Sequence, residues 1–232
     1  MKKILNHLTT DWYKYLLELI VITAGVLGAF ALNNWNESRK TVQTEFKILS
    51  LLEKNLSEDL VDMELNMAIY QLRHRANSEI IKVFDKPTYT DDSLYYFYAN
   101  LGPNPYFLGN TSGYDNLKAV GFEIIKNDGI REEITNVHGA RYQWIRDLEK
   151  DHSNFYHNKV EPLMMKHIRI EVVFDDARPK DQLALAADHE FREAIIINIA
   201  WNAYMIERYN EIKIEVKDLV DEINMEIAKR SS

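Results

Sequence analysis

Hydrophobic residues follow two different patterns along the chain, and the change lies near residue 33. Residues 15–32 (YLLELIVITAGVLGAFAL) are apolar apart from Glu18. A helix of this length covers about 27 Å, close to the roughly 30 Å hydrocarbon core of a bilayer. Aromatic residues of the kind found at membrane interfaces flank the run: Trp12, Tyr13, Tyr15 and Trp35. The run therefore predicts a transmembrane helix at residues 15–34.

Two other interpretations of this run fit less well. A buried core helix needs neither this length nor the flanking aromatic residues. A cleaved signal peptide usually has an apolar region of about 7–15 residues followed by small residues at the cleavage site. Here the run is longer and Asn33-Asn34-Trp35-Asn36-Glu37 follows it. We therefore expect an uncleaved signal anchor.

Basic residues on the two sides of the run nearly balance, so they say little about its orientation. Those before it are Lys2, Lys3 and Lys14, and those after it are Arg39, Lys40 and Lys47. Under the positive-inside rule a short basic tail is more easily retained than translocated. We expect residues 1–14 to be cytoplasmic and residues 35–232 to form an extracytoplasmic domain.

Beyond this run, apolar residues recur every three or four positions, as in a helix that packs on one face. No glycine or proline lies between Gly28 and Pro87 or after Pro179, which predicts a long helix in each stretch. The first helix should continue from the membrane to about Phe84, with the apolar seam Val42, Phe46, Leu49, Leu52, Leu56, Leu60, Met63, Met67 and Tyr70. The last has a two-heptad, coiled-coil-like seam of Tyr209, Ile212, Val216, Leu219 and Ile223. Residues 194–201 are apolar nearly all round and should be the most deeply buried.

The middle of the chain holds five of the eight glycines and predicts shorter elements. Asp91-Asp92-Ser93 can cap a short helix over residues 94–98, and Thr111-Ser112 can cap another that ends at Gly121. A turn is expected at residues 102–105, and a third long helix from about residue 130 to about residue 162.

Residues 168–174 alternate between apolar and other side chains, as a strand does. Because no partner strand is evident, an extended connector or frayed helix is favoured over a strand.

Charge and cysteine content exclude several classes of function. Residues 41–232 carry 23 basic and 33 acidic side chains, so this part has a net charge of −10 and should bind neither nucleic acid nor anionic lipid. The absence of cysteine excludes disulfides, thiolate catalysis and Cys-based zinc sites.

Two segments resemble an uncharacterised family of small bacterial single-pass membrane proteins. The first is KYLLE at residues 14–18 followed by the apolar run and NNWNE at residues 33–37. The second is GYDNLKAVGFEII at residues 113–125, where that family usually has Ser-Gly in place of Val120-Gly121. The resemblance implies a helical envelope protein and brings no activity or site residues.

Candidate metal ligands are few. On the third expected helix, His157 and Glu161 are four residues apart, a spacing that suits a metal pair and equally an ordinary ion pair, with His152 and Asp151 nearby. His152 lies five residues before His157, about 140° around a helix, and no HExxH motif is present. We expect no metal site.

Other chemical motifs are also missing from the sequence. Asp188-His189-Glu190 is typical of a charged helix start. No phosphate loop, nucleophile elbow or cofactor fingerprint is present. We expect neither an enzyme nor a cofactor.

Two groups of residues are candidates for contacts with partners. Within the apolar run, Ala24 and Gly28, and Gly25 and Ala29, form small-xxx-small pairs that favour close helix packing, and Glu18 lies on the same face. An interfacial position for Glu18 is favoured over a contact between helices. The second group is aromatic, and Tyr95, Tyr96, Tyr98, Tyr106 and Phe107 would be its partner surface; Phe97 and Tyr114 belong to the same group. A structural role in capping the bundle is favoured for this aromatic group.

The sequence thus predicts an all-α protein in which one transmembrane helix continues into a bundle of three long helices capped by shorter ones. We expect a non-enzymatic interaction or scaffold protein of the bacterial inner membrane, with a periplasmic domain. Its partners would be the lipid bilayer, further copies of itself and another envelope protein. The alternatives are an extracytoplasmic sensor that works with a separate transducer, and an ion- or proton-linked channel subunit that uses Glu18.

Overall fold

The computed structural model of the protein describes residues 12–231. Its contacts divide the chain into two compact units, Met1–Ile48 and Leu49–Ser232. Helix α2 (Trp12–Asp85) contributes residues to both units. Most of the expected cytoplasmic tail, including Lys2 and Lys3, lies outside the described residues.

The described part of the first unit is helical, and every side chain from residue 12 to residue 40 is exposed. Among the described residues, α2 is the one helix that is long and apolar enough to cross a membrane. Burying apolar surface stabilises a protein by roughly 25 cal/mol per Å². An uncovered apolar run of this length is therefore unfavourable in water, and a bilayer is one environment that would cover it.

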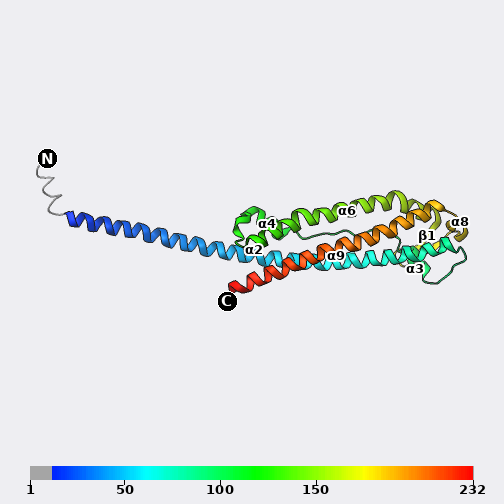
Figure 1. Ribbon diagram of the computed structural model, residues 1–232, viewed down its shortest axis with the longest axis horizontal. Coiled ribbons are helices and arrows are strands. Elements are labelled where there is room, and N and C mark those ends of the chain that lie inside the picture. Colours follow the sequence, from blue (N-terminus) through cyan, green and yellow to red (C-terminus); the bar gives the residue numbers. More distant parts are fainter. Residues whose placement is uncertain (1–11, 232) are drawn as a thin grey trace. The chain divides into compact units, whose positions relative to one another are not determined.

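The second unit is a bundle of three long helical stretches, as predicted. They are the remainder of α2, the stretch from Asp128 to His167, and α9 (His189–Ser231) (Figure 1). The α9 seam is buried, with no member more than 2% exposed, and Leu49, Leu52, Leu56, Met63 and Tyr70 of the α2 seam are wholly buried. The prediction began the α2 seam too near the N-terminus, because its first two residues, Val42 and Phe46, are 51% and 39% exposed.

The middle helical stretch continues beyond Pro162, which differs from the prediction. It consists of α5 (Asp128–Asn136), η2 (Val137–Arg141), α6 (Tyr142–Phe155), η3 (Tyr156–Val160) and α7 (Glu161–His167). Both η segments are π turns, and in η3 the Glu161 N–H donates to Tyr156 O, five residues back. Pro162 then lies in the first turn of α7, where its missing N–H costs nothing. A π turn just before a proline thus lets the helix continue.

Short helices lie between the long ones, and the first two of them are at the predicted positions. They are α3 (Leu94–Ala99), α4 (Ser112–Val120), η1 (Phe122–Ile124) and α8 (Gln182–Ala186). The Ser93 N–H donates to Asp91 Oδ1 over 2.8 Å just before α3. Helix α4 ends at Gly121, whose φ of 104° is a conformation that favours glycine.

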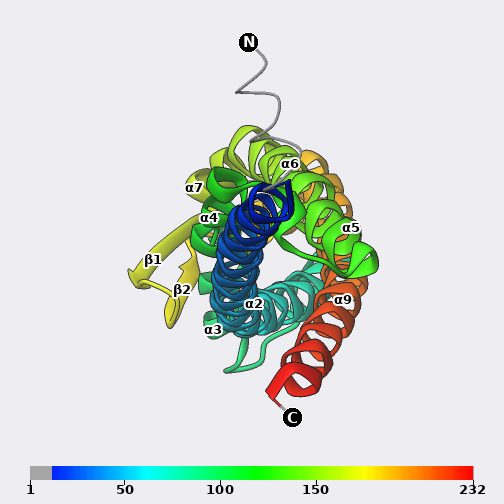
Figure 2. The same cartoon turned by 90° about the vertical axis from the view of Figure 1, so that its left-hand side faces the viewer.

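Residues 168–179 form a β-hairpin, so the expectation of an extended connector was wrong. Strand β1 (Ile168–Val172) pairs antiparallel with β2 (Asp176–Pro179), with Ile170 opposite Ala177 and a register irregularity before Val172. The hairpin stands at the side of the bundle beside α3 (Figure 2). The Asn100 side chain of the segment after α3 donates to Phe174 O over 2.9 Å, which ties down the turn of the hairpin.

The apolar segment at residues 194–201 is not the most deeply buried part of α9. Ile195 is fully buried, but Ile196 and Ile197 are 36% and 45% exposed. Asn198 and Asn202 instead face the interior and are almost completely buried. A bundle helix buries one face only, so a segment that is apolar all round leaves apolar side chains on its outer face.

Candidate functional site

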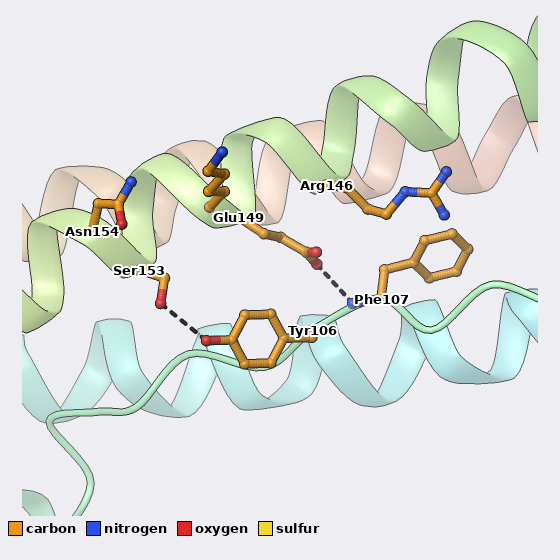
Figure 3. Close-up of a pocket in the computed structure, with 7 residues that line it drawn as sticks. Tyr106, Phe107, Arg146, Glu149, Ser153 and Asn154 are labelled. Atoms are coloured by element: carbon orange, nitrogen blue, oxygen red, sulfur yellow. Dashed lines mark hydrogen bonds between the residues drawn. The ribbon is translucent and has the colours of Figure 1, made fainter.

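A line of polar residues on α2 lies beside the apolar seam and faces the interior of the bundle. Asn55, Asp59, Asp62 and Asn66 are spaced 4-3-4, and three of them are at most 5% exposed, with Asp62 half-buried. Asp59, Asp62 and Asn66 bind residues 102–111, an extended segment between α3 and α4 that we call the strap. Asn55 binds the first two residues of α4. Figure 3 shows the strap passing between α2 and α6.

The α2 side chains bind the strap mainly through its backbone. Asp62 Oδ2 accepts from the Leu108 N–H over 3.0 Å, and Asp59 Oδ1 accepts from the Asn110 N–H over 2.6 Å. The other Asp59 oxygen accepts from the Tyr142 hydroxyl over 2.7 Å. Burial raises the pKa of Asp59, although both hydrogen bonds oppose this effect. These bonds supply partners for backbone N–H groups that no sheet or helix would satisfy.

Asn55 likewise accepts hydrogen bonds at the point where the strap meets α4. Its Oδ1 accepts from the Gly113 N–H and from the Ser112 hydroxyl, both over 2.8 Å. A Cβ at Gly113 would lie 3.2 Å from Leu52 Cα, so a glycine permits the close approach of α4 to α2.

Glu149 of α6 holds the strap from the opposite side and is only 2% exposed. Its Oε1 accepts from the Phe107 N–H over 2.9 Å and from the Tyr209 hydroxyl of α9. Asn66 donates to the same Tyr209 oxygen over 3.3 Å and to the carbonyl of Tyr106 over 3.2 Å. Burial raises the pKa of Glu149 to about 7, although both hydrogen bonds to it act in the opposite direction. The strap is thus linked to all three long helices.

A cavity of about 290 Å³ opens between the strap and α6. Its lining residues are Tyr106, Phe107, Arg146, Glu149, Lys150, Ser153 and Asn154. In Figure 3, Glu149 points to the backbone of Phe107, Tyr106 reaches Ser153, and Arg146 lies beside the Phe107 ring. The cavity therefore combines two aromatic rings with side chains of both charges.

A second buried polar group surrounds His152, one turn further along α6. The His152 Nε2 lies 2.9 Å from Asn198 Oδ1, and the Asn198 amide donates to Asn77 Oδ1 over 3.1 Å. The His152 ring stacks on Tyr70 and on Trp201, with ring centroids 5.9 and 5.2 Å apart. Burial lowers the pKa of His152 to about 4, so the ring is neutral at neutral pH.

The metal candidates lie apart from one another. His152 is fully buried, whereas His157 and Glu161 form an exposed pair 2.8 Å apart. Across residues 12–231 no group of three or more potential ligands could hold a metal ion. Asp188 lies directly before α9 and its Oδ1 accepts from the Phe191 N–H over 3.1 Å, so the predicted helix start is confirmed.

The aromatic candidates divide into buried and exposed residues. Tyr98 and Phe107 are 1% and 3% exposed, so they cannot belong to the partner surface predicted for them. Tyr95, Tyr96 and Tyr106 are 39%, 40% and 53% exposed. Tyr95 does not share the burial of Tyr98; Arg178 of the hairpin lies over its ring, 4.7 Å from the centroid.

The residues expected to mediate helix contacts in the membrane all lie on the exposed part of α2. They are Glu18, Ala24, Gly25, Gly28 and Ala29. A Cβ built at Gly25 or at Gly28 would have no atom within 4 Å. Close packing against this face is therefore sterically open to another helix.

No family model, no curated protein and no solved structure matches the chain. The resemblance of residues 14–37 and 113–125 to a bacterial membrane protein family stays a prediction. Function must therefore be argued from the site itself.

Sequence reasoning missed Glu149 and the polar line on α2. Carboxylates of an acidic helical protein are usually solvated, so residue type alone gives no reason to single these residues out. The 4-3-4 spacing of Asn55, Asp59, Asp62 and Asn66 was the available signal, because it places four polar side chains on one face next to an apolar seam. Chemically, these groups can clamp an extended segment, and the Glu149 carboxyl can exchange a proton near neutral pH.

Proposed function

We propose that the protein is a membrane-anchored interaction protein of the bacterial envelope, without enzymatic activity, in which residues 15–34 span the inner membrane. The observation that carries this proposal is the exposed apolar run joined, within one helix, to a folded bundle. The bundle can be stable in water without a bilayer. The apolar run at residues 15–32, in contrast, is about as long as the hydrocarbon core of a bilayer is thick, and a bilayer would bury its side chains. The basic tail favours a cytoplasmic position for residues 1–14, and the bundle would then lie in the periplasm.

The buried polar groups favour an interaction role over catalysis. Asp59, Asp62 and Glu149 each hold the strap through one oxygen that accepts from a backbone N–H group. The strap in turn presents Tyr106 and Leu108 to the surface, where they are 53% and 81% exposed. Exposed aromatic and aliphatic side chains on a clamped backbone are typical of contact surfaces.

We further propose that the protein self-associates through α2. The pairs Ala24 with Gly28 and Gly25 with Ala29 would let two helices approach closely in the membrane. Gly28→Ile should weaken association by about 1–2 kcal/mol, because a branched side chain separates the backbones. Leu27→Ile, on a different face of the same helix, is the matched control and should have no effect.

The test is a measurement of oligomeric state and partners in mild detergent. Full-length protein and both variants are cross-linked in membranes, purified and analysed by mass spectrometry. We expect a self-cross-link that Gly28→Ile reduces and Leu27→Ile retains, together with a co-purifying envelope protein. A protein that stays monomeric at all accessible concentrations and retains no partner would contradict the proposal.

A sensor is the second candidate function, and the cavity beside the strap favours it. A ligand bound there would contact α6 and the strap, which is also bonded to α2. Such a sensor would require a separate transducer.

A further inference from the structure

Two cations of α6 at the cavity have no acidic partner among residues 12–231. Arg146 and Lys150 are four residues apart and both line the cavity. Neither forms a salt bridge or hydrogen bond with another residue of the described chain, whereas Arg131, Arg141 and Arg178 are each paired within 3 Å with an acid.

The opposite charge of the cavity is supplied by Glu149. Its Oε1 already accepts two hydrogen bonds, but its Oε2 accepts none from a described residue. Arg146 lowers the pKa of Glu149, so the two charges interact, yet they form no ion pair. The cavity therefore offers a ligand one anionic hydrogen-bond acceptor, Glu149, and two cationic hydrogen-bond donors, Arg146 and Lys150.

We propose that the cavity between the strap and α6 binds a small zwitterion of the α-amino acid type. The ammonium group of the ligand donates to Glu149 Oε2, and its carboxylate accepts from Arg146, with Lys150 adding charge at the rim. A guanidinium group suits a carboxylate because two parallel N–H groups can bind two oxygens. The side chain of the ligand lies against the rings of Tyr106 and Phe107, which favours an apolar or aromatic amino acid.

Charge separates this ligand class from its two simplest alternatives. A ligand with only a positive charge would face Arg146 and Lys150, which outnumber Glu149 at the cavity. A ligand with only a negative charge would pair with the cations, but it would lie beside the Glu149 carboxylate and would leave Glu149 Oε2 without a donor. The cavity volume of about 290 Å³ lies near the lower limit for small-molecule pockets, which suits a single amino acid.

Binding is tested by calorimetry on the full chain in detergent micelles at pH 8, where Glu149 is ionised. The probes are L-phenylalanine, L-leucine, N-acetyl-L-phenylalanine, which lacks the ammonium group, and 2-phenylethylamine, which lacks the carboxylate. We expect saturable binding of at least one free amino acid below about 10 mM and at least about tenfold weaker binding of both phenylalanine analogues, the change in Kd produced by about 1.4 kcal/mol. Equal binding of either analogue, or no saturable binding of either amino acid, would overturn the proposal.

Variants connect binding to the two charges. Arg146→Gln should weaken amino acid binding about tenfold or more, while Lys217→Gln, an exposed position on α9, removes the same charge elsewhere and should change nothing. Glu149→Gln should weaken binding to a similar degree, and circular dichroism establishes that this variant is folded. If Arg146→Gln binds the amino acid as well as the unmodified protein does, the site is wrong, whatever the outcome for Glu149. The result is independent of the membrane anchor, so it can fail while the proposed function stands.

Discussion

Replacing Glu149 by glutamine should change how the stability of the bundle depends on pH. Glutamine keeps an acceptor oxygen for the Phe107 N–H and the Tyr209 hydroxyl, but it cannot ionise. The pKa of Glu149 is about 7 in the folded protein, against an ordinary value of 4.5. Between these values the folded state holds a proton that the unfolded state has lost.

The sign and size of the effect follow from this difference. A carboxyl with a raised folded-state pKa stabilises the fold at pH values below its unfolded pKa, and this contribution disappears as the pH rises through the folded pKa. The difference between the folded-state and the ordinary pKa of Glu149 corresponds to about 3 kcal/mol of unfolding free energy. The free energy of unfolding of Glu149→Gln, relative to the unmodified protein, should therefore rise by about 3 kcal/mol between pH 4 and pH 8.

The assay is urea unfolding of residues 41–232 followed by circular dichroism at several pH values, after a check that the fragment unfolds cooperatively. Glu222→Gln, at an exposed position on α9, is the matched control because it makes the same substitution away from the strap. If the difference in unfolding free energy between Glu149→Gln and the unmodified protein does not vary with pH, the reasoning is refuted. That result would mean that folding does not raise the pKa of the Glu149 carboxyl.

Further predictions concern the core and the histidines. Ile195→Ala, at a fully buried position, should lower the free energy of unfolding by about 2–5 kcal/mol. Trp201→Ala should cost less, about 2 kcal/mol, because this side chain is only partly buried and lines a surface cavity; a larger loss than for Ile195→Ala would contradict the burial of these side chains. His152→Gln should reduce the rise in unfolding free energy from pH 4 to pH 6.5, because a histidine with a lowered folded-state pKa stabilises the fold only as the pH rises through that range. If urea unfolding shows the same pH dependence for this variant and for the unmodified protein, the burial of His152 is contradicted. His157→Ala should leave the Tm unchanged with or without zinc, and a zinc-dependent Tm that this variant abolishes would restore the metal site.

The long helices could be predicted from the sequence because two signals agree there. Glycine and proline are absent over long stretches, and residues such as Leu49, Leu52 and Leu56 recur at helical spacing. Residues 15–32 were equally clear as an uninterrupted apolar helix, which the structure confirms, whereas the crossing of a membrane stays a prediction.

The hairpin could not be predicted because its second strand has no strand pattern. Strand β2 reads Asp-Ala-Arg-Pro, which lacks β-branched residues and ends in proline. It is stabilised by contact with α3 and by the bond from Asn100 to Phe174, both of which join segments far apart in the sequence. Tertiary contacts therefore decide this element.

The burial of Glu149 and the path of the strap could not be predicted, for a related reason. Whether Glu149 is solvated or buried depends on where the strap runs, and the strap has no regular pattern in the sequence. Its position is determined by the partners of its backbone N–H groups on α2 and α6, which become visible only once the helices are assembled.

The central claim is that residues 15–34 cross the inner membrane with the bundle on the periplasmic side. The chain contains no cysteine, so a single introduced thiol can report its own location. In intact spheroplasts a membrane-impermeant maleimide should label Lys217→Cys, whereas Lys3→Cys should be labelled only after lysis. Labelling of Lys3→Cys with protection of Lys217→Cys would reverse the orientation, and protection of both, with release of the protein by alkaline carbonate, would contradict the membrane anchor itself.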